Sequence, residues 1–215
     1  MIGVLGGTFD PVHFGHLRPA LEIQQALGLE EVRLMPAHMP PHRSQPHASP
    51  QQRLAMLRAA VADDPVFTVD AREYEREGPS YTLDTLQSLR AGLSGKDLCL
   101  LVGMDAFCGF SGWHRWREIP DYCHLVVMTR PGNTLPEQGE LAEFIHLHRV
   151  PDAEVLKTRV SGLLLFHPVS QLEISATQIR KLLAAGKRAD FLLPKSVLEV
   201  IRNEGLYGAE TQHGG

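Results

Sequence analysis

The stretch Gly6-Gly7-Thr8-Phe9-Asp10-Pro11-Val12-His13-Phe14-Gly15-His16 decides the fold. It follows a short apolar run, residues 2–5, which predicts a buried strand, and it precedes an amphipathic segment that ends at Gly28. A glycine-rich turn between a strand and a helix lets the backbone approach a phosphate closely, and the first N–H groups of the helix point at it. The two histidines would add cationic donors. The stretch therefore predicts a phosphate-binding turn.

Pro19 indicates where the helix after this turn begins. Proline has no N–H group and is tolerated in the first turn of a helix. We therefore expect the helix to start near Gly15 or His16. This start would place His16 at the positive end of the helix dipole, with His13 in the loop just before it.

Length and composition narrow the class of protein. The chain has 215 residues, of which 43% are hydrophobic and 21% are charged. This predicts one globular domain over residues 1–208 and a flexible tail at 209–215. The net charge of −4 argues against a nucleic-acid partner. Three cysteines without metal or disulfide spacing, no signal-peptide pattern and no apolar run near ~18 residues predict a cytoplasmic protein without a membrane partner.

Strand and helix patterns alternate along most of the chain. Strands are expected at 31–35, 67–71, 97–102, 124–128 and 163–166, and helices at 51–62, 82–93, 140–146, 174–185 and 194–203. Residues 37–50 form a proline-rich loop. The alternation predicts an α/β fold, a Rossmann-like doubly wound parallel sheet with helices on both faces and a small C-terminal helical part. Ligands of such folds bind at the carboxyl ends of the strands.

Three segments should meet at that edge of the sheet. They are the opening turn, the turn Gly103-Met104-Asp105 and residues 174–180. Ser175 or Thr177 can cap the helix that follows, and its first N–H groups would be open to an anion. Arg180 lies one turn further on the side of Thr177, where its guanidinium can reach a phosphate with two N–H groups. Together these segments predict a triphosphate site.

Each feature also has a simpler interpretation. His13 and His16 could only cap the helix, the segment Ser175-Ala176-Thr177 could be an ordinary cap, and Arg180 could be a surface charge. The loop histidines His38, His42 and His47 could suggest a metal site, but their spacing matches no standard set of ligands.

Two motifs carry a resemblance to a known family. The opening stretch resembles the H-x-G-H signature of the nucleotidyltransferase superfamily, and residues 174–180 resemble its I-S-S-T-x-x-R motif, with Ala176 in place of the middle serine. Ser80-Tyr81-Thr82-x-x-Thr85-Leu86, Gly103-x-Asp105 and Trp113 are similar to nucleotide-binding segments of the bacterial nicotinate-nucleotide adenylyltransferases. The resemblance covers roughly residues 1–208.

The resemblance implies a reaction. The 5′-phosphate of nicotinate mononucleotide would attack the α-phosphorus of ATP, giving deamido-NAD and pyrophosphate in NAD biosynthesis, without a covalent enzyme intermediate. It implies that His16 contacts the α-phosphate in the transition state and that His13 binds the ATP phosphates beside it. Ser175, Thr177 and Arg180 would hold the β- and γ-phosphates. Mg²⁺ would be held mainly by the ATP phosphates, with no protein metal ligand. The implied ATP-binding residues are Gly6, Gly7, Thr8, Phe9, His13, His16, Gly103, Ser175, Thr177 and Arg180.

The implied residues for the mononucleotide lie in other segments. Trp113 would stack on the pyridine ring, although a half-buried core tryptophan is the alternative. Thr82 would offer its backbone N–H to the nicotinate carboxylate, and Asp105 would contact the ribose or the ring region. His42 and Arg43 would reach the acceptor phosphate. His114 stands after Trp113, where the family often has an aromatic residue such as tyrosine.

Other functions remain open from the sequence. An enzyme of the same superfamily could accept the amide mononucleotide, phosphopantetheine or a polyol phosphate. A nucleotide-binding regulator could keep the site without chemistry, although intact His13, His16 and Arg180 argue against it. An RNA-binding module is disfavoured by the net charge. The sequence does not fix the oligomeric state.

Overall fold

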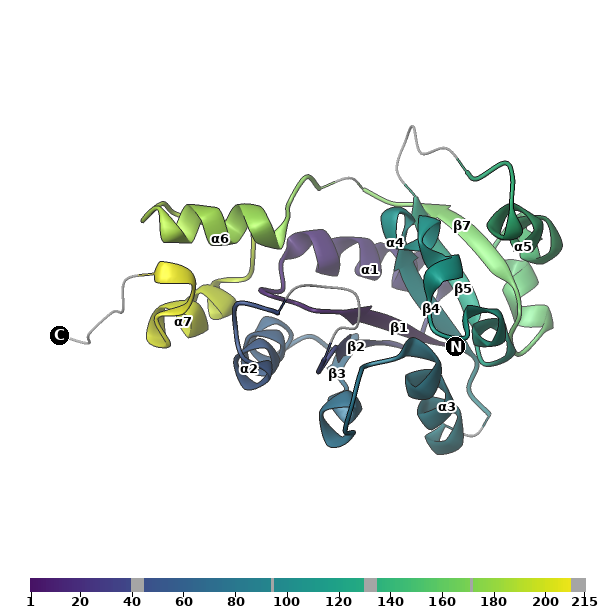
Figure 1. Cartoon of the computed structure of the whole chain (residues 1–215), viewed down its shortest axis with the longest axis horizontal. Helices are drawn as coiled ribbons and strands as arrows, with labels where there is room; N and C mark the ends of the chain where they lie inside the picture. The colour runs from purple at the N-terminus through teal and green to yellow at the C-terminus, as the bar shows by residue number, and fades with distance from the viewer. Residues whose placement is uncertain (40–44, 94, 130–134, 171, 210–215) are drawn as a thin grey trace.

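A single parallel sheet forms the centre of the molecule (Figure 1). The computed structural model describes residues 1–39, 45–93, 95–129, 135–170 and 172–209. Seven strands within these ranges pair in the order β3-β2-β1-β4-β5-β7-β6, and every pair is parallel. The strands are β1 Ile2–Gly7, β2 Glu31–Pro36, β3 Phe67–Val69, β4 Leu98–Gly103, β5 His124–Thr129, β6 Arg149–Val150 and β7 Leu164–Pro168.

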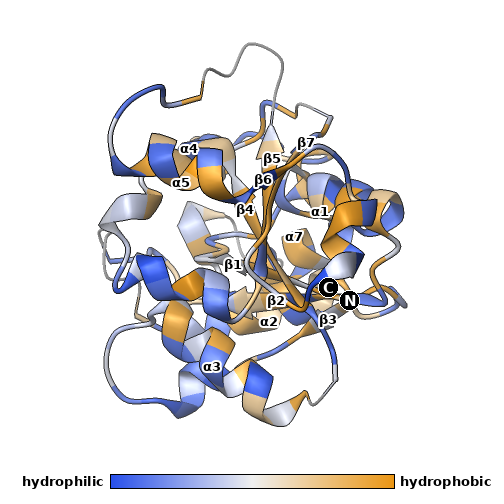
Figure 2. Ribbon diagram, turned by 90° about the vertical axis from the view of Figure 1, so that its right-hand side faces the viewer, coloured by the Kyte–Doolittle hydropathy of each residue, from blue (hydrophilic) through white to orange (hydrophobic). Residues whose placement is uncertain are grey.

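Helices cover both faces of this sheet. Their bounds are α1 Phe14–Leu27, α2 Pro50–Ala60, α3 Thr82–Gly92, α4 Met104–Cys108, α5 Glu140–His148, α6 Ala176–Ala184 and α7 Lys195–Asn203. Helices α1, α2, α6 and α7 contribute to one hydrophobic core, and α3, α4 and α5 contribute to the other. Figure 2 shows the sheet nearly edge-on, with α3, α4 and α5 on one side and α1 and α7 on the other. The predicted doubly wound fold with a small C-terminal helical part is confirmed.

The strands serve both cores because their side chains alternate between the two faces. In β4, Cys99 and Leu101 belong to the core beneath α1, whereas Leu98, Leu100 and Val102 belong to the core beneath α3. A parallel strand that is buried on both faces needs such a continuous apolar run. This explains why residues 98–102 are apolar without interruption.

The start of α1 differs slightly from the expectation. The helix begins at Phe14, so Pro19 lies in its second turn and not in its first. The extended backbone of His13 caps the helix, and its N–H group donates to His16 Nδ1 at 3.3 Å. Pro19 removes only the bond that its own N–H would have donated to the carbonyl of Gly15. The cap, and not the proline, therefore sets the first residue of α1.

Other elements show how local sequence sets the boundaries. Ser49 and Gln52 form a reciprocal cap at the start of α2, with bonds of 3.3 Å and 2.9 Å. Gly28 ends α1 in the left-handed conformation, with φ of 62°. Pro194 caps α7 from outside the helix, where the sequence had suggested its first residue. The two-residue strand β6 was not predicted, because it is too short to show periodicity.

The fold creates a binding edge between β1 and β4. These neighbouring strands continue into α1 and α4, which lie on opposite faces of the sheet. Ligands of doubly wound folds bind at such a switch point, outside the carboxyl ends of the strands. Gly7 ends β1 and Gly103 ends β4, so both glycines lie at this edge. No helix in the described part of the chain is long and apolar enough to cross a membrane.

Candidate active site

A polar cavity of about 680 Å³ opens at this edge. Its walls come from the turn after β1, the start of α4 and the start of α6, so the three predicted segments do meet. The turn after β1 leads into the N-terminus of α1, and α6 also begins at this cavity, so the dipoles of two helix N-termini favour an anion there. We call this site the polar cavity. Its lining includes Gly6, Gly7, Thr8, Phe9, His13, His16, Gly103, Asp105, Ser175, Thr177 and Arg180.

His13 and His16 form one unit at the start of α1. Their ring centroids lie 3.8 Å apart, and the His13 N–H group donates to His16 Nδ1. Because Nδ1 accepts this bond, a neutral His16 carries its proton on Nε2. Burial lowers the pKa of the His13 imidazole to about 4, so this side chain is neutral at pH 7. The expectation that both histidines are cationic is therefore wrong for His13, because it is 5% exposed.

Gly15 is required between the two histidines by close packing. A Cβ atom at this position would lie 2.9 Å from His13 Nδ1 and 3.0 Å from the carbonyl oxygen of Ile174. Ile174 directly precedes the cap of α6, so Gly15 sets how closely the two helix N-termini approach. This contact gives a physical reason for the glycine in the H-x-G-H pattern.

Arg180 connects α6 to the opening turn. Its Nη1 donates to the carbonyl oxygen of Asp10 at 2.7 Å, and its Nη2 donates to Thr177 Oγ1 at 3.3 Å. Ser175 caps α6 by accepting from the N–H of Gln178 at 3.1 Å. The guanidinium is thus held at a fixed place in the wall of the cavity. The simple interpretation as a mobile surface charge does not fit this geometry.

Asp10 is a structural residue of the site that sequence reasoning missed. Its buried carboxylate accepts bonds from the N–H groups of His47 and Ala48 at 2.8 Å and 3.1 Å, and from the Tyr207 hydroxyl at 2.6 Å. Burial and this carboxylate raise the pKa of Tyr207. Asp10 therefore joins the opening turn to two distant segments. The only signal in the sequence was an acidic residue within a turn predicted to bind phosphate.

Arg53 is a second residue that the sequence did not reveal. It is fully buried, and its guanidinium donates to the carbonyl oxygens of Thr8, Ala37 and His38 at 2.8 Å, 2.7 Å and 3.2 Å. It therefore fixes the chain after β1 to the chain after β2. An arginine in a helix usually lies at the surface, so no pattern distinguished it.

A second cavity, of about 550 Å³, lies against α3. We call it the aromatic cavity, because Tyr81, Trp113 and His114 line it. Tyr81 stacks on His114 with centroids 4.2 Å apart, and Trp113 meets Phe110 edge-on at 5.4 Å. Trp113 is half-buried, so it packs on the core and also faces the cavity. Other residues of this lining are Glu73, Ser80, Thr82, Thr85, Gly103 and Asp105.

The remaining predicted residues are placed as follows. Thr82 is the first residue of α3, where a backbone N–H has no acceptor within the helix. Asp105 lies in the first turn of α4 and is exposed. His42 and Arg43 lie outside the described residues. Within the described ranges, no three His, Cys, Asp or Glu side chains gather in a way that could hold a metal ion.

The two cavities share a wall. Leu5, Gly6, Gly7, Thr8, Gly103, Asp105 and Ala106 line both of them. Gly6 and Gly103 leave this wall open, because a Cβ atom at either position would meet no atom within 4 Å. Two ligands, one in each cavity, would therefore meet across the carboxyl ends of β1 and β4.

Comparison with known proteins identifies the family. The sequence model of the cytidylyltransferase-like family matches residues 4–182. The probable nicotinate-nucleotide adenylyltransferase of Aeromonas salmonicida is 49% identical over 209 residues, which cover 97% of this chain and 98% of that protein. The protein of the same name from Pseudomonas syringae pv. tomato is 50% identical over 214 residues, or 99% and 96% of the two chains.

A solved structure shows the same fold. The nicotinic acid mononucleotide adenylyltransferase of Plasmodium falciparum, complexed with NaAD, superposes with a TM-score of 0.71 at 15% identity and covers 98% of each chain. At this identity the likeness shows the fold alone. Taken with the relatives near 50% identity, the chain belongs to the cytidylyltransferase-like family and, within it, to the nicotinate-nucleotide adenylyltransferases.

Proposed function

We propose that this chain transfers the adenylyl group of ATP to nicotinate mononucleotide, giving nicotinate adenine dinucleotide (deamido-NAD) and pyrophosphate in NAD synthesis. The observation that carries the proposal is the wall shared by the polar and aromatic cavities. A reaction that joins two nucleotides needs two adjacent sites whose reacting phosphates meet. The names of the relatives and the NaAD bound to the Plasmodium protein support the same choice of substrates.

The polar cavity would hold the triphosphate of ATP. The dipoles at the starts of α1 and α6 favour an anion there, and Arg180 adds a fixed positive charge. In this proposal Ser175, Thr177 and Arg180 hold the β- and γ-phosphates. Gly6, Gly7, Thr8 and Phe9 let the turn approach the nucleotide, with Gly103 across the cavity.

The aromatic cavity would hold the mononucleotide. Trp113 would stack on the pyridine ring, and the N–H of Thr82 at the start of α3 would meet the nicotinate carboxylate. Asp105 lines both cavities, so it would contact the ribose near the reacting phosphates. His42 and Arg43 would complete this side at the acceptor phosphate.

The chemistry needs positioning and charge stabilisation. An oxygen of the acceptor 5′-phosphate forms a bond to the α-phosphorus of ATP, while the bond from that phosphorus to the bridging oxygen breaks and pyrophosphate leaves. The attacking phosphate is already an anion at pH 7, so neither a strong base nor an enzyme nucleophile is required. His16 would donate from Nε2 to the α-phosphate oxygens as charge builds up there. His13 would hold His16 in that orientation.

ATP is expected to enter as its magnesium complex. Asp10, a buried carboxylate in the lining of the polar cavity, already accepts three hydrogen bonds from the protein, so it is not disposed to bind a cation. Phosphate oxygens and water would therefore hold Mg²⁺, as its preference for oxygen ligands and retained waters allows. The ion would neutralise charge on the phosphates and on the leaving pyrophosphate.

The proposal is tested by a substrate panel. Purified protein is mixed with Mg²⁺-ATP and, separately, the acid mononucleotide, the amide mononucleotide, phosphopantetheine or a polyol phosphate, and pyrophosphate and dinucleotide are measured. We expect the fastest release with nicotinate mononucleotide and none when α,β-methylene-ATP replaces ATP, because its α–β link cannot be cleaved. No release with either mononucleotide would refute the proposal, and faster release with the amide would change the assigned substrate.

A further inference from the structure

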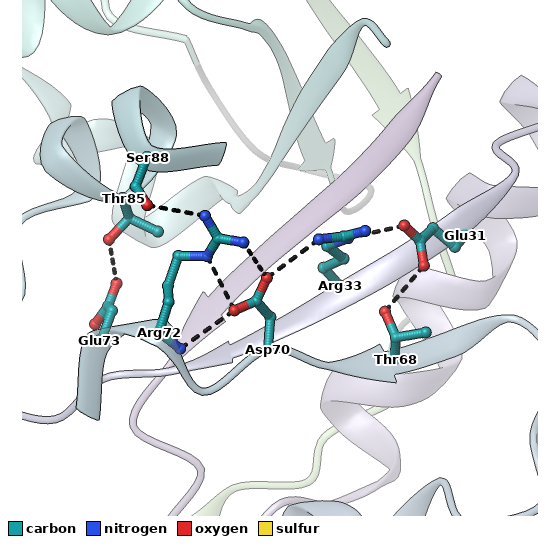
Figure 3. A network of polar contacts seen from close by, with 8 residues as sticks. All are labelled: Glu31, Arg33, Thr68, Asp70, Arg72, Glu73, Thr85 and Ser88. Carbon is teal, nitrogen blue, oxygen red and sulfur yellow. Dashed lines mark hydrogen bonds and ion pairs between the residues drawn. The ribbon is translucent and has the colours of Figure 1, made fainter. Parts of the chain in front are cut away.

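Glu73 is a buried acidic residue in the lining of the aromatic cavity. It lies in a short 3-10 helix, Arg72–Glu75, and is 7% exposed. Its Oε1 accepts a hydrogen bond from Thr85 Oγ1 at 2.6 Å (Figure 3), and Arg76 donates to the same hydroxyl at 3.1 Å. Its Oε2 is also buried and has no hydrogen-bond partner among the residues that the structure describes.

The position of Glu73 is fixed by its neighbours. Arg72 donates to Ser88 Oγ on α3 at 2.9 Å and pairs with Asp70 at 2.7 Å (Figure 3). Asp70 also pairs with Arg33 on β2 at 3.2 Å. These bonds hold the short helix between β2 and α3. Glu73 therefore cannot readily turn its carboxylate out to water.

The cavity beside this carboxylate is lined by aromatic rings. Tyr81, Trp113 and His114 contribute to the same lining as Glu73. A buried carboxylate with an unpaired oxygen is costly unless a positive group lies near it. The Arg76 guanidinium reaches the Oε1 side through the Thr85 hydroxyl, whereas the buried Oε2 has no hydrogen-bond partner in the described part of the chain. Aromatic faces also attract cations, through the negative potential above each ring. An anion and aromatic rings in one cavity together fit a ligand that is flat and positively charged.

We propose that Glu73 is a specificity-determining residue that recognises the positive charge of a pyridinium ring in the aromatic cavity. This inference rests on the proposed function, which places the mononucleotide there. The N-glycosidic bond makes the ring nitrogen quaternary, so this nitrogen keeps its positive charge at every pH, in addition to the carboxylate on the same ring. Glu73 selects a ring with this positive nitrogen over a ring of the same shape without it, and Thr85 holds the Glu73 carboxylate in place.

The test compares two ligands that differ by one charge. Nicotinate mononucleotide is matched with its C-glycoside, in which carbon replaces the ring nitrogen. Both ligands keep the same ring carboxylate, so they differ only in the positive charge of the ring nitrogen. Binding of each is measured by isothermal titration calorimetry in the presence of α,β-methylene-ATP. The variants are Glu73→Gln, which keeps an oxygen for Thr85, and Glu75→Gln, which removes a charge from an exposed residue of the same short helix.

The expected result is a change in the ratio of the two affinities. Glu73→Gln should lower the affinity for nicotinate mononucleotide on the order of tenfold relative to the affinity for the C-glycoside. The ring carboxylate is common to both ligands, so its interaction with residue 73 cancels in this ratio. Glu75→Gln should change neither affinity. An equal loss for both ligands, or no loss for either, would overturn the inference.

Two further measurements test the role of the Glu73 charge without the Glu73→Gln variant. Thr85→Val removes the hydrogen bond to the Glu73 carboxylate but keeps the negative charge. The preference for nicotinate mononucleotide over its C-glycoside should therefore persist. If Glu73→Gln does not fold, the wild-type protein still decides, because equal affinity for the two ligands would overturn the inference. Failure of the proposed function would instead appear in the wild-type protein as absent turnover with nicotinate mononucleotide.

Discussion

The polar and aromatic cavities share a wall but are built in different ways. The polar cavity has two helix N-termini, backbone turns and one fixed guanidinium. The aromatic cavity is lined by rings and by the buried carboxylate of Glu73, from segments between β3 and the chain after α4. Backbone N–H groups suit phosphate, which is the same on every nucleotide, whereas side chains can distinguish one ring from another.

This difference suggests that the two cavities control different properties of the enzyme. The polar cavity would set the chemistry and its rate, because the α-phosphate is proposed to react there. The aromatic cavity would set the choice of acceptor. Substitutions in the first should therefore change turnover or ATP binding, and substitutions in the second should change the response to the mononucleotide.

The largest effect is expected from His16→Ala. The substitution removes the Nε2 donor proposed to stabilise charge on the α-phosphate, so kcat should fall on the order of 10² or more, as for other preorganised donors. The Kd for ATP should change less, because the helix N-termini and Arg180 remain. Pyrophosphate release and calorimetry measure the two quantities, and His146→Ala, on the exposed face of α5, serves as the control. Near-normal turnover in His16→Ala would contradict the assigned role.

A smaller effect should follow from Gly15→Ala. The added methyl group would lie 3.0 Å from the carbonyl oxygen of Ile174, so the start of α6 must move away from the start of α1. Such overpacking costs about 1–3 kcal/mol of the free energy of unfolding, and turnover should fall with the loss of geometry. Gly92→Ala is the matched control, since its methyl group meets nothing within 4 Å. Urea unfolding of both variants measures this, and equal stability would show that the contact is unimportant.

The smallest effect concerns the pH dependence of stability. Burial lowers the pKa of His13 to about 4, below the ordinary histidine value of about 6.5. The unfolded chain therefore binds more protons than the folded chain between these pH values. The contribution of buried, neutral His13 to the free energy of unfolding is complete above about pH 6.5 and is lost as the pH falls toward 4. The loss should reach about 1 kcal/mol at pH 5.5. His13→Gln should lack this part of the slope in urea unfolding at pH 7.5 and 5.5, and an identical slope in both proteins would contradict the burial effect.

The sequence predicted the sheet and the polar cavity better than the aromatic cavity. Glycines, caps and strand-to-helix turns are local, so residues 6–16 and 174–180 were recognisable without the fold. The burial of His13 was not, because it depends on the fold, which brings the start of α6 against Gly15 beside the His13 ring. Asp10, Arg53 and Glu73 resemble surface charges in the sequence. Their partners lie in other segments, and only the folded chain brings these together.

The most direct test of the account is a crossed measurement of two Michaelis constants. The KM values for ATP and for nicotinate mononucleotide are determined in two variants. Arg180→Lys loses the pair of guanidinium N–H donors, and Trp113→Ala loses the aromatic ring proposed to stack on the pyridine. We predict that Arg180→Lys raises the KM for ATP about tenfold and that Trp113→Ala raises the KM for the mononucleotide about tenfold, from the loss of about 1–3 kcal/mol in each case. Each variant should leave the other constant within about threefold. If either substitution raised both constants equally, the two cavities would not be separate substrate sites.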